Sequence, residues 1–295
     1  MAVLTIAGLT LREAVRKRTL FGALLMGLLI FGLSLLLIPI RHELESRVAD
    51  FSHDQRWLLQ QAPIARSHIM SLCFFTIRAL GSLFAVLLAG GALSGEIERG
   101  LFAVILPKPI HRWEIYVGKW LGLQAILVGS VLFWTALVWL SLTVQTHAQL
   151  TSILLAGCYL ALFPVVLGTM TLTLSAVTPR LLGTVVALVL GAFSWFDGIL
   201  NTLGMYWDTE LLQKIANVAS VIVPQGCIAW WIRNATQGIT FYDERIPPLG
   251  ESPQMVREWG ESHLHHFAHL DAVYLVGYLL TLFIVGIFLF QRRDI

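Results

Sequence analysis

Long apolar runs alternate with short polar stretches along the whole chain, and this pattern predicts membrane-spanning helices. A hydrocarbon core about 30 Å thick requires about 20 apolar residues at 1.5 Å per residue. Six runs come close to that length, and we expect each to cross the membrane as a helix. The predicted spans are about 20–40, 71–93, 119–143, 150–177, 181–200 and 271–290.

Composition supports this interpretation. The chain has 295 residues, of which 57% are hydrophobic and 13% are charged, whereas soluble domains average about 25% charged residues. No internal repeat or flexible linker divides it, so we predict an all-α polytopic membrane protein with one membrane domain over 1–295. A formal net charge of +2 is too small to indicate a nucleic-acid partner. The three cysteines are widely separated and form neither a disulfide framework nor a metal motif.

The segment before the first run mixes apolar residues, such as Leu4, Ile6 and Leu9, with Arg12 and Arg16. This pattern predicts a weakly amphipathic helix lying flat on the inner leaflet. The run that follows is too long for a signal peptide and ends without a small-residue cleavage site, so we expect an uncleaved anchor.

Lysine and arginine collect in the amino-terminal arm, in the loop at 94–118 and in the tail, where Arg292 and Arg293 lie. Such residues favour the cytoplasmic side. We therefore predict that both termini and the 94–118 loop are cytoplasmic and that residues 201–270 form an outer region with short helices. Within that region the apolar segment at 211–232 is expected to be re-entrant or interfacial, because a full crossing would place the tail arginines outside.

The loop between the second and third runs carries the densest polar sequence. Glu96, Glu98 and Arg99 follow the second run, and Pro107 and Pro109 stop any helix that reaches them. The pattern predicts a short helix over 96–106, a rigid break, and a new helix that begins at residues 110–113.

That new helix carries two glycines four residues apart, Gly118 and Gly122. The absence of side chains at this spacing allows two helix backbones to approach closely. The spacing would therefore permit a close helix contact at this position.

The amino-acid sequence of this loop resembles the cytoplasmic signature of type-2 ATP-binding-cassette (ABC) transporter permeases. It is most similar to the branch associated with multi-copper-enzyme maturation, including permeases that serve nitrous oxide reductase assembly. Leu101 and His111 depart from the commonest pattern, which has threonine and serine at these places. The matching segments are Gly95-Glu96-x-Glu98-x-Gly100, Leu106-Pro107-Lys108-Pro109-Ile110-x-Arg112-Trp113-Glu114 and Gly118-Lys119-x-Leu121-Gly122.

This resemblance implies the permease subunit of an ATP-driven exporter in a bacterial inner membrane. It also implies a homodimer of permeases with two copies of a separate cytoplasmic ATPase, which binds ATP and magnesium and receives the 96–106 coupling helix. The implied coupling interface comprises Glu96, Glu98, Arg99, Gly100, Leu101, Phe102, Leu106, Pro107, Lys108, Pro109 and Arg112.

The chain itself is not expected to be an enzyme or to hold a cofactor. Its Gly118-Lys119 pair is followed by Trp120 and has Trp113 where the first glycine of an ATP-binding loop belongs. ATP hydrolysis must then come from the partner.

Two features of the predicted spans are candidates for a substrate path. Arg78 lies within the second span, where an ionisable side chain either contacts substrate, pairs with an acidic neighbour or extends to the interface. Pro164 interrupts the fourth span and predicts a kink, followed by threonines available to neighbouring helices.

A histidine cluster precedes the last span and comprises His263, His265, His266 and His269. A helix there would place two of them one turn apart, which suits a metal ion, but a polar cap above the span requires no ligand. Two alternative functions follow from the sequence. One is a membrane anchor or sensor that binds a partner or metal through 201–270, and the other is a secondary transporter.

Overall fold

The structure, a computed structural model, is entirely helical in the residues it describes, as the sequence predicted. These are 2–16, 21–32, 35, 62–98, 111–146, 151–179, 181–192 and 270–293, with 214, 228, 231, 232 and 235. The labelled helices are α1 (Ala2–Arg16), α4 (Ala62–Ala89), α5 (Ser94–Glu98), α7 (Arg112–Thr146), α8 (Thr151–Leu160), α9 (Leu162–Val177) and α14 (Leu270–Arg292).

Four helical segments are long and apolar enough to cross a membrane, and they correspond to the second, third, fourth and sixth predicted spans. The first and fifth appear as shorter apolar helices, Phe21–Gly32 and Leu181–Ala192, and the rest of those two spans lies outside the described residues. Six crossings therefore stay a prediction. The four long segments are Leu72–Glu98, Arg112–Thr143, Thr151–Val177 and Ala272–Arg292.

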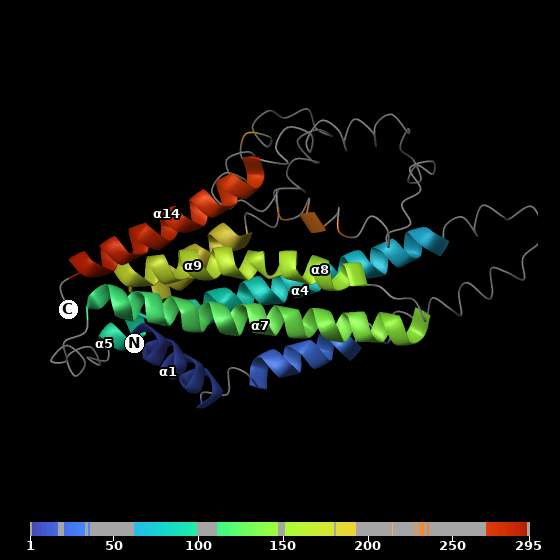
Figure 1. The fold of residues 1–295 in the computed structure, drawn as a ribbon, viewed down its shortest axis with the longest axis horizontal. Helices are drawn as coiled ribbons and strands as arrows, with labels where there is room; N and C mark the ends of the chain where they lie inside the picture. The colour runs from blue at the N-terminus through green and yellow to red at the C-terminus, as the bar shows by residue number, and fades with distance from the viewer. Residues whose placement is uncertain are drawn as a thin grey trace, which may run out of the picture.

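The long helices form a bundle in which α4 packs against α9 and α7, and α14 packs against the same two helices. Figure 1 shows α7 along the bundle with α4 and α9 beside it. Trp134 of α7 is fully buried and its indole Nε1 donates to the carbonyl of Ala23, 2.8 Å away, in the helix Phe21–Gly32. This bond fixes the first apolar helix against the middle of α7.

The fourth predicted span is broken into α8 and α9 at Ala161. Pro164 lies in the first turn of α9 and has no N–H to donate to the preceding turn, so the break confirms the predicted kink. Further along α9, the hydroxyls of Thr169, Thr171 and Thr173 donate to carbonyls four residues earlier. These hydroxyls are thereby satisfied within an apolar helix.

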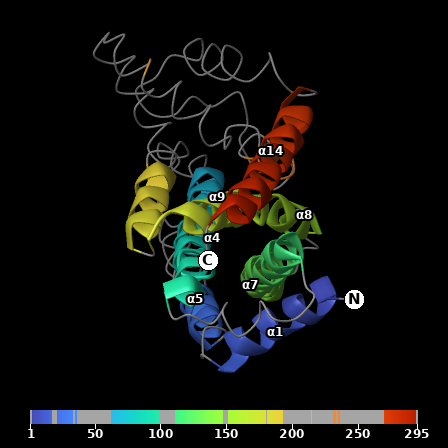
Figure 2. The same ribbon diagram turned by 90° about the vertical axis from the view of Figure 1, so that its left-hand side faces the viewer.

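Helix α1 lies across α7 at the same end of the bundle as α5 (Figure 2). The contact confirms the prediction made from the glycine spacing. A Cβ at Gly118 would lie 2.7 Å from Cβ of Ile6, and one at Gly122 would lie 2.7 Å from Cβ of Thr10. Helix α1 is therefore the partner that the two glycines admit.

Candidate functional site

The chain turns sharply between α4 and α5. Gly90 occupies the turn, where a Cβ would lie 2.8 Å from the carbonyl oxygen of Val86. The hydroxyl of Ser94 donates to the Gly90 carbonyl at 3.3 Å, and the amide of Ile97 donates to that of Leu93 at 3.0 Å. The turn and α5 together form a compact corner at the end of the bundle.

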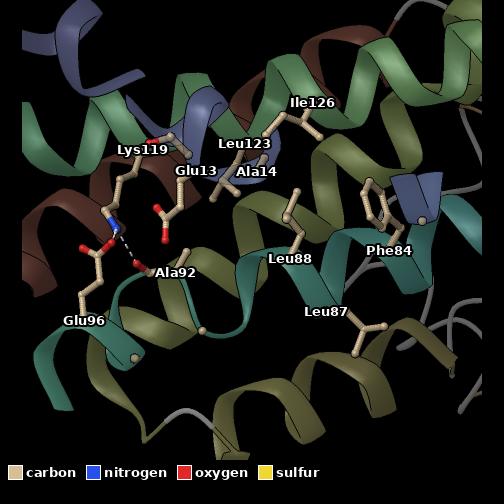
Figure 3. Close-up of a pocket in the computed structure, with 14 residues that line it drawn as sticks. Glu13, Ala14, Phe84, Leu87, Leu88, Ala92, Glu96, Lys119, Leu123 and Ile126 are labelled. Carbon is tan, nitrogen blue, oxygen red and sulfur yellow. Dashed lines mark hydrogen bonds and ion pairs between the residues drawn. The ribbon is translucent and has the colours of Figure 1, made fainter. Parts of the chain in front are cut away.

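A buried ion pair joins α5 to α7. The ammonium of Lys119 pairs with the Glu96 carboxylate and also donates to the Ala92 carbonyl at 2.6 Å (Figure 3). The two side chains are only 9% and 19% exposed. Removing one partner of a fully buried pair typically costs about 3–5 kcal/mol, which is an upper bound for this largely buried one. The pair links α5, which precedes the stretch 99–110, to the second turn of α7, which follows it, and that stretch lies outside the described residues.

The side chain of Glu114, in the first turn of α7, caps the amino-terminal end of this helix. The Glu114 carboxylate accepts a hydrogen bond from the backbone N–H of His111 at 3.0 Å, which is half of a capping box. The serine that is common at position 111 is therefore not needed to start this helix.

Two arginines then join three helices at this end of the bundle. The Arg112 guanidinium donates to the carbonyls of Gln291 and Arg293, at 3.3 and 2.7 Å. Arg293 in turn donates to the last carbonyls of α9, those of Ser175 and Ala176, at 3.4 and 2.7 Å. A cation at a helix C-terminus satisfies its open carbonyls and interacts favourably with its dipole. We call this set of contacts the arginine network.

Further along, a polar ladder connects α7 to α9. Its α7 members are Tyr116, Trp120 and Gln124, which lie four residues apart on one face of the helix. The Trp120 indole and the Gln124 amide both donate to the Thr169 hydroxyl, at 2.9 and 3.1 Å. The Tyr116 and Thr173 hydroxyls share a hydrogen bond of 3.1 Å. Such bonds fix the register of antiparallel helices where no water competes.

The structure brings together only part of the predicted coupling interface. Glu96 is held by Lys119, and Glu98 is exposed on the last turn of α5. The Arg112 guanidinium donates to the end of α14 and so joins helices of this chain, and its contact with an ATPase stays a prediction. The other expected members, Arg99, Gly100, Leu101, Phe102, Leu106, Pro107, Lys108 and Pro109, lie outside the described residues.

The two candidates for a substrate path lie together where α4 meets α9. The Arg78 guanidinium lies 4.4 Å from the centre of the Phe163 ring, next to Pro164. A cation over an aromatic face is stabilised by about 0.5–2 kcal/mol. Packing against Phe163 therefore accounts for part of the stabilisation of Arg78 within the bundle.

The structure gives no support to a metal site among the residues it describes, where no three histidine, cysteine, aspartate or glutamate side chains gather. The predicted cluster of His263, His265, His266 and His269 lies outside those residues.

The sequence analysis did not predict the roles of several residues of this site, chiefly Lys119, Glu114 and Arg293. The four-residue spacing of the polar side chains on α7 was a usable signal for the ladder. The arginine network had no local signal, because its acceptors are backbone carbonyls more than one hundred residues away in the chain.

Comparison with known proteins gives one result that covers the chain. Residues 4–295 match the family described as ABC-2 family transporter protein. No curated protein matches the chain.

Proposed function

Because this chain belongs to the ABC-2 transporter family, and is thus a multi-pass permease of an ABC transporter, we propose that its segment 94–112 receives the movement of a separate ATPase. The observation that carries this proposal is the buried ion pair between Lys119 and Glu96. A surface loop can transmit a displacement only if its two ends are fixed to the helices that must move.

The ion pair meets that requirement. It joins α5, on the amino-terminal side of the stretch, to the second turn of α7, on the carboxyl-terminal side. The bond from Lys119 to the Ala92 carbonyl adds the turn that follows α4. A displacement of segment 94–112 therefore moves α4 and α7 together instead of only deforming the segment.

From α7 the displacement passes to the rest of the bundle. The arginine network connects its first turn to the ends of α14 and α9, and the polar ladder continues the connection deeper along α9. Packed helices linked in this way move as rigid bodies between discrete arrangements. In this proposal ATP binding shifts the bundle from one arrangement to another.

The proposal extends to the assembly. The permease forms a homodimer, and two ATPase copies bind ATP and magnesium and contact segment 94–112, at the end of the bundle where α5 lies. That end is cytoplasmic, as the distribution of lysine and arginine favours. The complex exports its substrate. The amino-acid sequence of residues 94–119 favours the branch of this permease family that is associated with multi-copper-enzyme maturation.

The test is stimulation of the co-purified ATPase by the reconstituted permease. Glu98→Ala removes an exposed carboxylate on the last turn of α5. Glu96→Met with Lys119→Met breaks the link between α5 and α7 without leaving a buried charge. We expect both variants to raise the permease concentration that gives half-maximal stimulation. A loss of about 1–2 kcal/mol corresponds to a 5- to 30-fold increase.

Arg12→Ala is the matched control, because it removes an exposed charge at the same end but on α1. It should leave stimulation unchanged, and all variants should keep the unfolding temperature of the parent within a few degrees. Wild-type stimulation by both the Glu98 variant and the double variant would overturn the proposal.

A further inference from the structure

Helix α1 presents an exposed apolar surface on the side that α7 does not cover. Leu4, Leu11 and Val15 are 75%, 40% and 59% exposed. At about 100° per residue these three side chains lie within about 40° of one another around the helix. Another side of α1 packs against α7 through Ile6 and Thr10. We call the three exposed residues the outer stripe.

The contact with α7 sets the depth of the outer stripe relative to the crossing helices. Ile6 and Thr10 lie against Gly118 and Gly122 of α7. Both glycines belong to the first part of Arg112–Thr143, a segment long and apolar enough to span a membrane. Figure 1 shows α1 beside this first part of α7 and not beyond the end of the bundle. This position favours lipid over a soluble protein as the neighbour of the outer stripe.

A second exposed apolar surface follows along the chain. The helix Phe21–Gly32 exposes Phe21, Leu24 and Leu28, each about half exposed or more. This helix is fixed to the middle of α7 by the bond from Trp134, so it and α1 both pack against α7. Hydrocarbon chains of one leaflet can therefore contact both surfaces.

Arg16 is an exposed cation beside the outer stripe. It lies in the last turn of α1, about a third of a turn around the helix from the centre of the stripe. In the part of the chain that the structure describes, no carboxylate pairs with it. Glu13, the acidic residue of α1, lies elsewhere and lines the cavity beside Lys119 (Figure 3). The Arg16 guanidinium is therefore open to an anion from outside the protein.

The outer stripe and Arg16 together match the two parts of an anionic phospholipid. A guanidinium presents its N–H donors in a planar fork that suits the oxygens of a phosphate. A helix that lies in the membrane surface binds through its buried apolar side and through attraction of its cations to anionic lipids. In the sequence Lys17 and Arg18 follow Arg16 directly, so positive charge concentrates just before the first apolar helix.

We propose that the outer side of α1 binds an anionic phospholipid of the adjacent leaflet, such as phosphatidylglycerol. Arg16 donates to the phosphate of the lipid, and the acyl chains lie along Leu4, Leu11 and Val15. Phosphatidylcholine carries the same phosphate beside a quaternary ammonium, so it has no net charge and is bound more weakly. This binding does not depend on an ATPase partner or on the coupling proposed above.

The test compares two headgroups on the full-length chain. The protein is reconstituted in phosphatidylcholine nanodiscs that contain a trace of phosphatidylglycerol with a diazirine on its acyl chain. After photolysis, the yield of lipid adduct is measured on the peptides that cover α1. A phosphatidylcholine with the same diazirine gives the reference yield. We expect a higher yield from phosphatidylglycerol.

Arg16→Gln should lower the ratio of the two yields about fivefold, which corresponds to the attraction of about 1 kcal/mol that one basic residue near an anionic surface contributes. Arg292→Gln is the matched control, because it removes the same charge from an exposed arginine of α14, which lies over Phe288 of its own helix. It should keep the ratio measured on α1. Both substitutions are on the surface, so the unfolding temperatures should stay near that of the parent.

A second arm identifies what occupies the outer stripe. A photoreactive amino acid at position 11 should yield lipid adducts in the same nanodiscs, with or without the co-purified ATPase. Cross-links to the ATPase or to a second copy of the chain in place of lipid would overturn the proposal. So would equal yields from the two headgroups, or a ratio that Arg16→Gln leaves unchanged.

Discussion

At Gly286 the absence of a side chain lets α14 approach α7 closely. A Cβ at this position would lie 2.5 Å from Cζ of Tyr116 and 3.0 Å from the Thr173 hydroxyl. The Tyr116 ring is fully buried and also lies beside Phe283 and Phe290 of α14, with ring centres 5.9 and 6.3 Å away. One glycine thus permits three helices to meet around one tyrosine.

We predict that Gly286→Ala destabilises the protein by about 1–3 kcal/mol, because an added methyl group must displace the tyrosine or separate the helices. The measurement is the unfolding temperature in detergent. Gly277→Ala is the control, since a Cβ there meets nothing within 4 Å on the same helix. It should be neutral or slightly stabilising, as alanine favours a helix over glycine by about 1 kcal/mol. Equal effects at the two positions would contradict the packing described.

At the scale of elements, α1 depends on the two glycines of α7 for its position. A Cβ at Gly122 would also lie 3.0 Å from the Ala7 carbonyl, so a larger residue must push the α1 backbone away. We predict that Gly122→Val loosens α1 while α7 itself stays helical.

The reporter for this change is a cysteine at Ala14, which is 5% exposed on α1. In a background where Cys73, Cys158 and Cys227 are alanine, we expect Gly122→Val to raise the rate of maleimide labelling at position 14 about tenfold or more, since each 1.4 kcal/mol of opening free energy is a factor of ten. Gly129→Val should leave the rate unchanged, because that position is open. An unchanged rate in the Gly122 variant would contradict the dependence of α1 on this contact.

Sequence patterns predicted the elements better than their partners. Of the six apolar runs, four correspond to helices long and apolar enough to cross a membrane, and Pro164 predicted the break before α9, because hydrophobicity and a missing N–H act locally. The spacing of Gly118 and Gly122 predicted a close helix contact, but the identity of α1 as the partner depends on three-dimensional position. The ion pair of Lys119 with Glu96 was not predicted because it too depends on three-dimensional position, although both residues belong to the family-like motif of residues 95–122.

At the scale of the whole molecule, the arginine network connects the ends of α7, α9 and α14 through backbone acceptors. Arg293 is its centre, because it donates to α9 through its side chain and accepts from Arg112 through its carbonyl. Arg293→Ala removes the donor but keeps the backbone acceptor. A cation at a helix C-terminus contributes about 0.3–1 kcal/mol, and up to about 2 when partly buried, so the variant should stay folded.

We predict that Arg293→Ala lowers permease-stimulated ATPase activity while its unfolding temperature falls only slightly, because α9 no longer follows the end of α14. Arg112→Ala should act on the same connection, so the double variant should lose less than the sum of the two single losses. Arg292→Ala is the control, since this neighbouring arginine lies over Phe288 of its own helix, 4.2 Å from the ring centre. If Arg292→Ala lowered stimulation as much as Arg293→Ala did, the loss would follow from tail charge alone and the network would not transmit movement.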